Sequence, residues 1–211
     1  IALMLPPKTF WEMLNQSGFG TSTGSGFPGE VNGVLRPYHK WKPIEQVTMS
    51  YGHGISVNLM QLARAYTIFA SGGELKPISL LKRHSSLFGQ RVLSTETANA
   101  MSGMLEAVVQ TKGTGLKAQV SGYRVAGKTG TAHKRLENKK GYAADRYIST
   151  FAGYAPVSNP RLVVAVMIDE PSAGQYFGGT VAAPLFSEVM AAALWQLNVP
   201  RDAPGNIVSS P

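Results

Sequence analysis

Cysteine is absent from this chain of 211 residues. Without cysteine there can be no disulfide scaffold, no thiolate nucleophile and no zinc site with cysteine ligands. Four histidines are present, and their positions do not have the spacing of metal ligands: His39, His53, His84 and His133. We therefore expect no metal site, and nothing in the sequence calls for a cofactor.

Long hydrophobic runs are also missing. Even the longest apolar stretches, such as residues 162–168, are too short to span a bilayer. Residues 1–5 lack the basic start and the cleavage site of a signal peptide, and position 1 is not Met, so we expect the chain to begin inside a larger protein. Charged residues make up only 15% and hydrophobic residues 44%, which indicates a folded chain.

The net charge of +8 suits nucleic acid, an anionic membrane surface or an acidic substrate. The basic residues are scattered, with one local cluster at Lys134, Arg135, Lys139 and Lys140. No aromatic side chains interleave with this cluster, as stacking on bases would require. A solvated surface charge is therefore favoured, and no nucleic-acid partner is expected.

The hydrophobic periodicity predicts four helices. Two are expected over residues 9–16 and 181–197, and two more begin at the caps Ser56 and Ser94. A glycine pair at 72–73 ends the helix that Ser56 begins.

Five strands are expected, over residues 78–82, 91–93, 123–131, 147–155 and 162–169. A charged loop at 133–146 and a tight turn at 156–160 join the last three strands into an antiparallel meander. No domain boundary is expected within residues 1–199, and the Pro-, Gly- and Ser-rich residues 200–211 are expected to form a flexible tail.

One motif has two interpretations. Residues 122–129 match the phosphate-loop pattern G-x-x-x-x-G-K-[ST], and the strand at 162–169 ends in Asp, as the magnesium-binding strand of such enzymes does. A phosphate loop needs a helix directly after its Lys, whereas Gly130 and a charged loop follow here. The two motifs also lie too close together for a parallel crossover with another strand and helix. Nucleotide binding is therefore disfavoured.

The same residues fit the K-T-G motif of penicillin-binding proteins and serine β-lactamases, which lies on an accessible edge strand beside the active site. An extended peptide ending in D-Ala can pair with such a strand. Lys128 supplies a positive charge near the substrate carboxylate and the nucleophile, and Thr129 and Thr131 offer it hydroxyl donors. Gly130 lets the substrate approach closely, and the Thr131 N–H helps to form an oxyanion hole.

Longer stretches favour the second interpretation. The segment Val125-Ala-Gly-Lys-Thr-Gly-Thr-Ala-His-Lys134 resembles the K-T-G strand of division-specific class B penicillin-binding proteins of Gram-negative bacteria. Further stretches resemble the same family in the same order, at residues 24–30, 50–56, 59–63, 168–171 and 176–179. The resemblance covers residues 19–199, most of the chain.

This resemblance implies an α+β protein with the serine β-lactamase/transpeptidase-like fold, an antiparallel sheet flanked by helices. Residues 1–199 would be the C-terminal portion of the transpeptidase domain, completed by an upstream part. The implied reaction cross-links peptidoglycan stem peptides through a serine acyl-enzyme, and β-lactams acylate the same serine. The implied location is the periplasmic face of the bacterial inner membrane, with septal cell-wall synthesis proteins as partners and an N-terminal membrane anchor outside this chain.

The resemblance also assigns substrate-binding residues by position. Tyr147 corresponds to a Tyr at the start of the strand after K-T-G, and Tyr176 and Phe177 correspond to an aromatic pair that precedes Gly178. Together these side chains would line the pocket. His53 and His133 complete the implied set: His53 lies where relatives often carry Tyr, and His133 where they often carry Arg or Lys.

The catalytic Ser and Lys of this family lie in an S-x-x-K motif, which S-x-N and then K-T-G follow. Ser79 with Lys82, and Ser56 with Asn58, satisfy these patterns in the reversed order. We reject both pairs, because Ser79 is expected in a strand and Ser56 as a helix cap, whereas the nucleophile belongs at a helix N-terminus. The nucleophile is therefore expected upstream, and the isolated chain is expected to be inactive.

Other functions remain open at this point. A serine β-lactamase or a β-lactam sensor shares the fold and the K-T-G motif. A wall-binding module without catalysis is a further possibility, and a phosphate-loop protein is a remote one.

Overall fold

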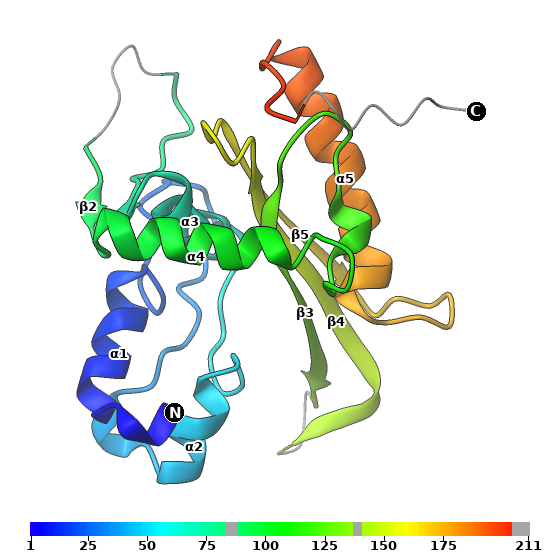
Figure 1. Ribbon diagram of the computed structural model, residues 1–211. Helices are drawn as coiled ribbons and strands as arrows, with labels where there is room; N and C mark the ends of the chain where they lie inside the picture. The colour runs from blue at the N-terminus through cyan, green and yellow to red at the C-terminus, as the bar shows by residue number, and fades with distance from the viewer. Residues whose placement is uncertain (83–87, 137–140, 204–211) are drawn as a thin grey trace. The chain divides into compact units, whose positions relative to one another are not determined.

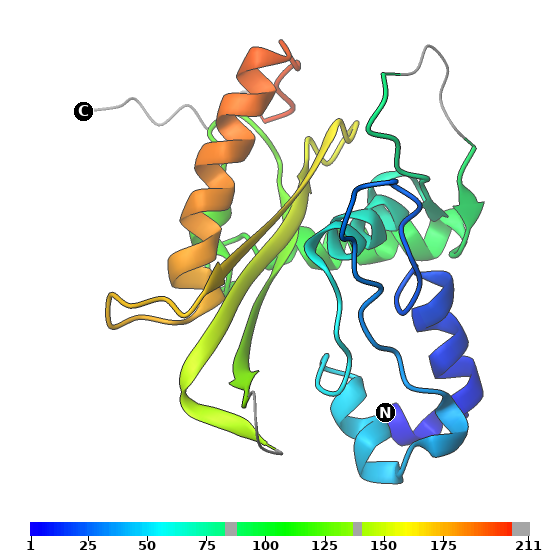
Figure 2. The ribbon, with the colours of Figure 1, turned by 180° about the vertical axis from the view of Figure 1, so that it is seen from behind.

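The computed structural model describes residues 1–82, 88–136 and 141–203 of the chain (Figures 1 and 2). These residues form two compact units, Ile1–Thr95 and Glu96–Pro211. The sequence indicates no boundary within residues 1–199, whereas the contacts divide the chain near the start of the helix that Ser94 precedes.

The first unit is mainly helical. Its elements are η1 (Ala2–Met4), α1 (Pro7–Gln16), η2 (Tyr38–Lys40), α2 (Pro43–Met49), α3 (Leu59–Ala70), β1 (Glu74–Leu75) and β2 (Gln90–Arg91). The predicted first helix is confirmed, and it begins two residues early because Pro7 fits the first helical turn. The glycine pair at 72–73 does follow the end of α3.

The cap of α3 differs from the expectation. Asn58, not Ser56, caps this helix: its Oδ1 accepts from the Gln61 N–H at 2.6 Å, and Gln61 Oε1 accepts from the Asn58 N–H at 2.9 Å. This reciprocal pair is a capping box. Ser56 instead forms an isolated bridge with Val34. The assignment of Ser56 as a cap is therefore wrong, although Ser56 still does not lie within a helix.

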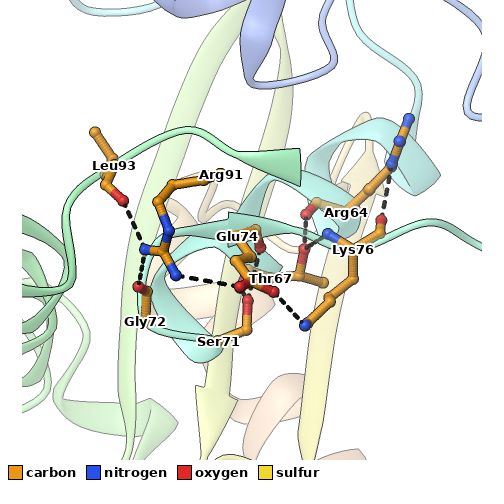
Figure 3. A network of polar contacts seen from close by, with 8 residues as sticks. All are labelled: Arg64, Thr67, Ser71, Gly72, Glu74, Lys76, Arg91 and Leu93. Atoms are coloured by element: carbon orange, nitrogen blue, oxygen red, sulfur yellow. Dashed lines mark hydrogen bonds and ion pairs between the residues drawn. The ribbon is translucent and has the colours of Figure 1, made fainter. Parts of the chain in front are cut away.

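The strand expected at residues 78–82 is also wrong. Ser79 Oγ donates to Leu81 O at 3.0 Å in an irregular segment. The strand that does form in this region is β1, which lies earlier in the chain and pairs with β2. Only Arg91 of the strand expected at 91–93 is in β2. Figure 3 shows why periodicity missed this hairpin: Arg91 donates to Glu74 Oε1 at 3.1 Å, and Lys76 donates to Glu74 Oε2 at 2.6 Å. Polar contacts join the two strands, and Leu75 is the one buried apolar side chain of the pair.

The second unit contains a three-stranded sheet between helices. Its elements are α4 (Thr95–Ala107), η3 (Leu116–Ala118), β3 (Ala126–Arg135), β4 (Tyr142–Ala155), β5 (Leu162–Asp169) and α5 (Gly178–Gln196). The sheet has the order β3-β4-β5, and both pairs are antiparallel, as the meander prediction requires. The helix that Ser94 precedes and the final helix are likewise confirmed.

The hairpin of β3 and β4 is longer than expected. β3 begins three residues later than predicted and continues to Arg135, and β4 already begins at Tyr142. Much of the charged loop expected at 133–146 is therefore strand, and residues 137–140 lie outside the described part of the chain. The charged sequence hid this extension because it lacks the alternation of apolar and polar residues that marks a half-buried strand.

The core of the second unit lies between the sheet and α5. Phe151 of β4 and Phe186 of α5 are both fully buried, with ring centroids 4.6 Å apart. Burial of one such side chain contributes about 1.5–3 kcal/mol. Figures 1 and 2 show α5 on one face of the sheet and α4 on the other. On the α4 face, the Tyr154 hydroxyl donates to Ser102 Oγ at 2.7 Å.

The residues after α5 return to the sheet. Asp202 accepts from the backbone N–H groups of Arg124 at 2.7 Å and of Ser158 at 3.1 Å. The Ala203 N–H donates to Gly122 O at 3.1 Å. The first residues of the expected flexible tail are therefore bound to the second unit, and residues 204–211 lie outside the described part.

No helix among the described residues has both the length and the apolar character that a membrane crossing requires.

Candidate functional site

The predicted K-T-G residues lie on β3. Within the described sheet β3 pairs only with β4, so its other edge presents unpaired backbone groups. Lys128 and Thr129 are strand residues, and the strand continues past them to Arg135. A phosphate loop places its Lys at the N-terminus of a helix. The structure therefore contradicts the phosphate-loop interpretation and supports the edge-strand interpretation.

Lys128 is exposed on this strand, and its ammonium group contacts the next residue. Nζ donates to Thr129 O at 3.1 Å and to Thr129 Oγ1 at 3.0 Å. Because an ammonium group can only donate, the Thr129 hydroxyl acts as an acceptor in this contact. The positive charge and the hydroxyl therefore lie together at one point of the strand.

A second hydroxyl, that of Thr114, meets Thr129. The two Oγ1 atoms lie 3.0 Å apart, and either can donate. When Thr114 donates, the Thr129 oxygen accepts twice and its own proton is free for a ligand. Sequence reasoning missed Thr114. The available signal was its two flanking glycines: a Cβ at Gly113 would overlap Val108 O, and one at Gly115 would approach the Phe151 ring to 2.9 Å.

The start of α5 contacts Thr131. The Gly178 N–H donates to Thr131 Oγ1 at 3.0 Å, which leaves the Thr131 proton free to donate elsewhere. A Cβ at Gly178 would lie 2.4 Å from both Gly130 O and Thr150 O. Glycine is therefore required at 178 by close packing on the strands. Gly130 has a weaker constraint, because a Cβ there would overlap the Thr150 Oγ1 side-chain atom and no backbone atom.

The structure brings the predicted aromatic residues together in one row. The Tyr147 and Tyr176 rings stack with centroids 3.9 Å apart, and Phe177 follows Tyr176 at 4.5 Å. His133 lies 4.5 Å from Tyr147 on the other side, and its Nδ1 is 2.8 Å from Ala143 O. Burial, with a smaller effect of Tyr176, raises the pKa of Tyr147 above its usual value. Phe177 is 60% exposed and ends the row at the solvent.

Part of the basic cluster at 134–140 is neutralised within the sheet. Lys134 lies where the β3–β4 register shifts, and its Nζ is 2.6 Å from Glu170 Oε1 and 2.9 Å from Asp169 Oδ2. These contacts, with Glu170 the larger, raise the pKa of Lys134. Lys134 thus connects the end of β3 to the end of β5, which agrees with a structural role for this charge. Sequence reasoning treated Lys134 as solvated.

The remaining predicted site residue, His53, belongs to the first unit. It lies in the turn after α2, where its N–H donates to Thr48 O at 3.0 Å. Its place in the substrate site stays a prediction. Neither Ser79 nor Ser56 lies at a helix N-terminus, so neither has the local structure of the nucleophile. Among the described residues, no three His, Asp or Glu side chains gather into a group that could hold a metal ion.

Comparison with known proteins places this arrangement in a family. Residues 1–191 match the penicillin binding protein transpeptidase domain, and the chain belongs to this family. The resemblance inferred from the K-T-G strand is thereby confirmed, and so is the fold class.

Individual relatives agree with the family. The chain is 42% identical to a probable peptidoglycan D,D-transpeptidase PenA of Neisseria flavescens, over 97% of this chain and 50% of that protein. It is 43% identical to a probable peptidoglycan D,D-transpeptidase PbpC of Pseudomonas aeruginosa, over 100% of this chain and 36% of that protein. The apo transpeptidase domain of Burkholderia pseudomallei penicillin-binding protein 3 superposes with a TM-score of 0.89 at 47% identity, over 96% of this chain and 61% of that one. The chain thus spans half or less of the length of these two curated relatives.

Proposed function

We propose that this chain is the C-terminal part of a peptidoglycan D,D-transpeptidase domain. Its β3 strand binds the carboxylate end of a stem peptide and of β-lactams. The observation that carries the proposal is the cluster on the open edge strand, where the Lys128 ammonium lies 3.0 Å from the Thr129 hydroxyl. The Thr131 hydroxyl lies two residues further along the same strand. The names of the relatives support the same activity.

The K-T-G residues of β3 each have a role in this proposed reaction. The extended stem peptide pairs with the free edge of β3, and its carboxylate lies near Lys128, Thr129 and Thr131. In this proposal the serine nucleophile is supplied by a part of the transpeptidase domain outside residues 1–211. It attacks the D-Ala-D-Ala bond, releases D-Ala and forms an acyl-enzyme, while the Thr131 N–H stabilises the oxyanion. The amine of a second stem peptide then resolves the acyl-enzyme.

The aromatic row supplies the apolar side of the pocket. Tyr147, Tyr176 and Phe177 contact apolar parts of the substrate or of a drug, and Gly178 and His133 adjoin them. The finer parts of the proposal are a location at the periplasmic face of the inner membrane and an association with septal cell-wall synthesis proteins.

Penicillin labelling tests the proposal. The full-length protein should take up a covalent fluorescent penicillin, and Lys128→Ala should slow this acylation about 100-fold, the usual scale for loss of one preorganised electrostatic contact. Lys117→Ala is the matched control, because Lys117 is exposed in η3 of the same unit. It should label at the wild-type rate.

Three results would count against the proposal. Equal labelling of wild type and the Lys128 variant would remove the K-T-G assignment. Labelling of the isolated chain at Ser79 or Ser56 would overturn the view that the nucleophile lies upstream. Rapid turnover of the β-lactam by the full-length protein would indicate a serine β-lactamase instead.

A further inference from the structure

The segment between β5 and α5 carries the aromatic pair, and it is tied to the sheet at two points. The Ser149 hydroxyl donates to the backbone carbonyl of Tyr176. Two residues later, the Gly178 N–H donates to Thr131 Oγ1 at 3.0 Å. Phe177 lies between these two anchors. We call residues 176–178 the aromatic segment; Figure 1 shows the orange connection that leads to it from β5.

The two anchoring hydroxyls are neighbours on the sheet. Ser149 of β4 pairs directly with Thr131 of β3, so both side chains lie on the same face. Ser149 is 0% exposed. A buried hydroxyl costs free energy unless it has a hydrogen-bond partner, and the Tyr176 carbonyl is that partner. Because Ser149 is buried, it supports the site without contacting a ligand.

The aromatic segment needs such anchors because its own packing is limited. Residues 171–177 have no regular secondary structure, and the Phe177 ring is 60% exposed. The Tyr176 ring stacks on Tyr147 with a centroid distance of 3.9 Å, and its other ring contact is with the exposed Phe177. The positions of both rings relative to the K-T-G strand therefore depend on where the backbone of the segment is fixed.

We propose that Ser149 is a positioning residue that fixes the aromatic segment against the K-T-G strand and thereby sets how strongly the site binds apolar groups of its ligands. This inference rests on the proposed function and adds a residue to it that neither the K-T-G motif nor the aromatic pattern reveals. Lys128 and Thr129 bond to each other, and Thr129 to Thr114, so their contact with the carboxylate does not depend on Ser149; Thr131 is the one carboxylate contact that is tied to the aromatic segment. The effect of Ser149 is thus specific to the ligand's apolar group.

Ser149→Ala in the full-length protein tests the proposal, because it deletes only the hydroxyl. The probes are two β-lactams with the same carboxylate, one with a bulky apolar side group and one without. The dissociation constant of the initial complex and the acylation rate constant are measured separately for each. Loss of one hydrogen bond of ordinary net strength predicts about 5–10-fold weaker initial binding of the bulky ligand. The small ligand should bind within about twofold of wild type. Any change in the acylation rate constant should be the same for both ligands, because both use the same Thr131 N–H.

Two control variants separate positioning from general loss of structure. Ser149→Thr keeps the hydroxyl and should restore discrimination between the two ligands. Phe177→Ala removes the exposed ring, and on that background Ser149→Ala should have little further effect, because coupled residues are not additive. Equal weakening of both ligands, or full additivity with Phe177→Ala, would overturn the proposal. If the Thr side chain proves too large for the buried site, the Ser149→Ala/Phe177→Ala double variant still tests the positioning role.

Hydrogen exchange gives a readout that needs no enzymatic activity. The Gly178 amide should exchange about fivefold or more faster in the Ser149→Ala protein, because the segment loses one of its two anchors. Unchanged exchange would overturn the positioning role. If the Gly178 amide exchanges faster in Ser149→Ala but the protein takes up no penicillin, the anchoring role of Ser149 is supported and only the proposed function is refuted.

Discussion

Gly178→Ala should destabilise the second unit and disturb the K-T-G strand together. Gly178 is the first residue of α5, and the added Cβ would lie 2.4 Å from both Gly130 O and Thr150 O. Real Cβ contacts essentially never fall below 3.0 Å, and both oxygens belong to the backbone of paired strands. The clash therefore cannot be relieved by rotating a side chain, and either the helix or the strands must move.

The size of the effect follows from the cost of overpacking. Forcing one extra methyl group into a packed site costs about 1–3 kcal/mol. With a urea dependence of about 2 kcal/mol per M, a loss of about 2 kcal/mol lowers the urea midpoint by about 1 M. Acylation by penicillin should slow as well, because Gly130 O is part of the K-T-G strand and the Gly178 N–H holds Thr131.

Gly103→Ala is the matched control in the same unit. Gly103 lies inside α4 and is exposed, and beyond its own helix no atom lies within 4 Å of the place that an alanine Cβ would take. Alanine in an exposed helix interior is favoured over glycine by about 0.5–1 kcal/mol. This variant should raise the midpoint and leave acylation unchanged. A Gly178→Ala protein with the wild-type midpoint and the wild-type acylation rate would refute the close-packing argument.

Three further substitutions test other contacts. Thr114→Val removes a hydrogen bond to Thr129 and should slow acylation by a carboxylate-bearing β-lactam about 5–10-fold. The ester of the same β-lactam should react as with wild type, and equal slowing of the ester would contradict this role. Tyr154→Phe should lower the free energy of unfolding by about 1 kcal/mol in urea titrations, because the hydrogen bond to Ser102 is lost, and an unchanged midpoint would show that this bond contributes nothing. Hydrogen bonds, led by one from a backbone N–H, lower the pKa of Glu30 from 4.5 to about 2, so its stabilising effect is present above 4.5 and is lost as the pH falls toward 2. Glu30→Gln should therefore destabilise the protein to urea at neutral pH but not near pH 2, and a difference that persists at the lowest pH would argue against the carboxylate as the cause.

The meander and the K-T-G strand could be predicted from the sequence because their signals are local. The apolar run of β5, the turn after Ala155 and the Lys128-Thr129 pair between two glycines each lie within a few residues. The strand-like residues around Lys128 also sufficed to disfavour the phosphate loop. The structure confirmed that decision by continuing β3 through Arg135 where a phosphate loop would begin a helix.

Two residues that the sequence misjudged, Ser56 and Lys134, have partners that lie far away in the chain. The cap of α3 is Asn58, since Gln61 completes the reciprocal bonds, whereas Ser56 pairs with Val34. The hairpin extension around Lys134 is charged, and its ion pairs with residues at the end of β5 cannot be recognised from hydrophobic periodicity. A long-range contact thus decided Ser56 and Lys134, whereas the Asn58 and Gln61 spacing is a local capping-box pattern that the sequence itself contains.

The sequence by itself determined which residues we propose to meet the ligand: the Lys128 to Thr131 strand and the aromatic row that the family pattern assigns. Only the tertiary structure decided what holds them, namely the Thr114 hydroxyl, the buried Ser149 and the close approach of Gly178. The physical reason is that chemical identity is carried by residue type and spacing, whereas orientation depends on hydrogen bonds and van der Waals contacts between segments that only folding brings together.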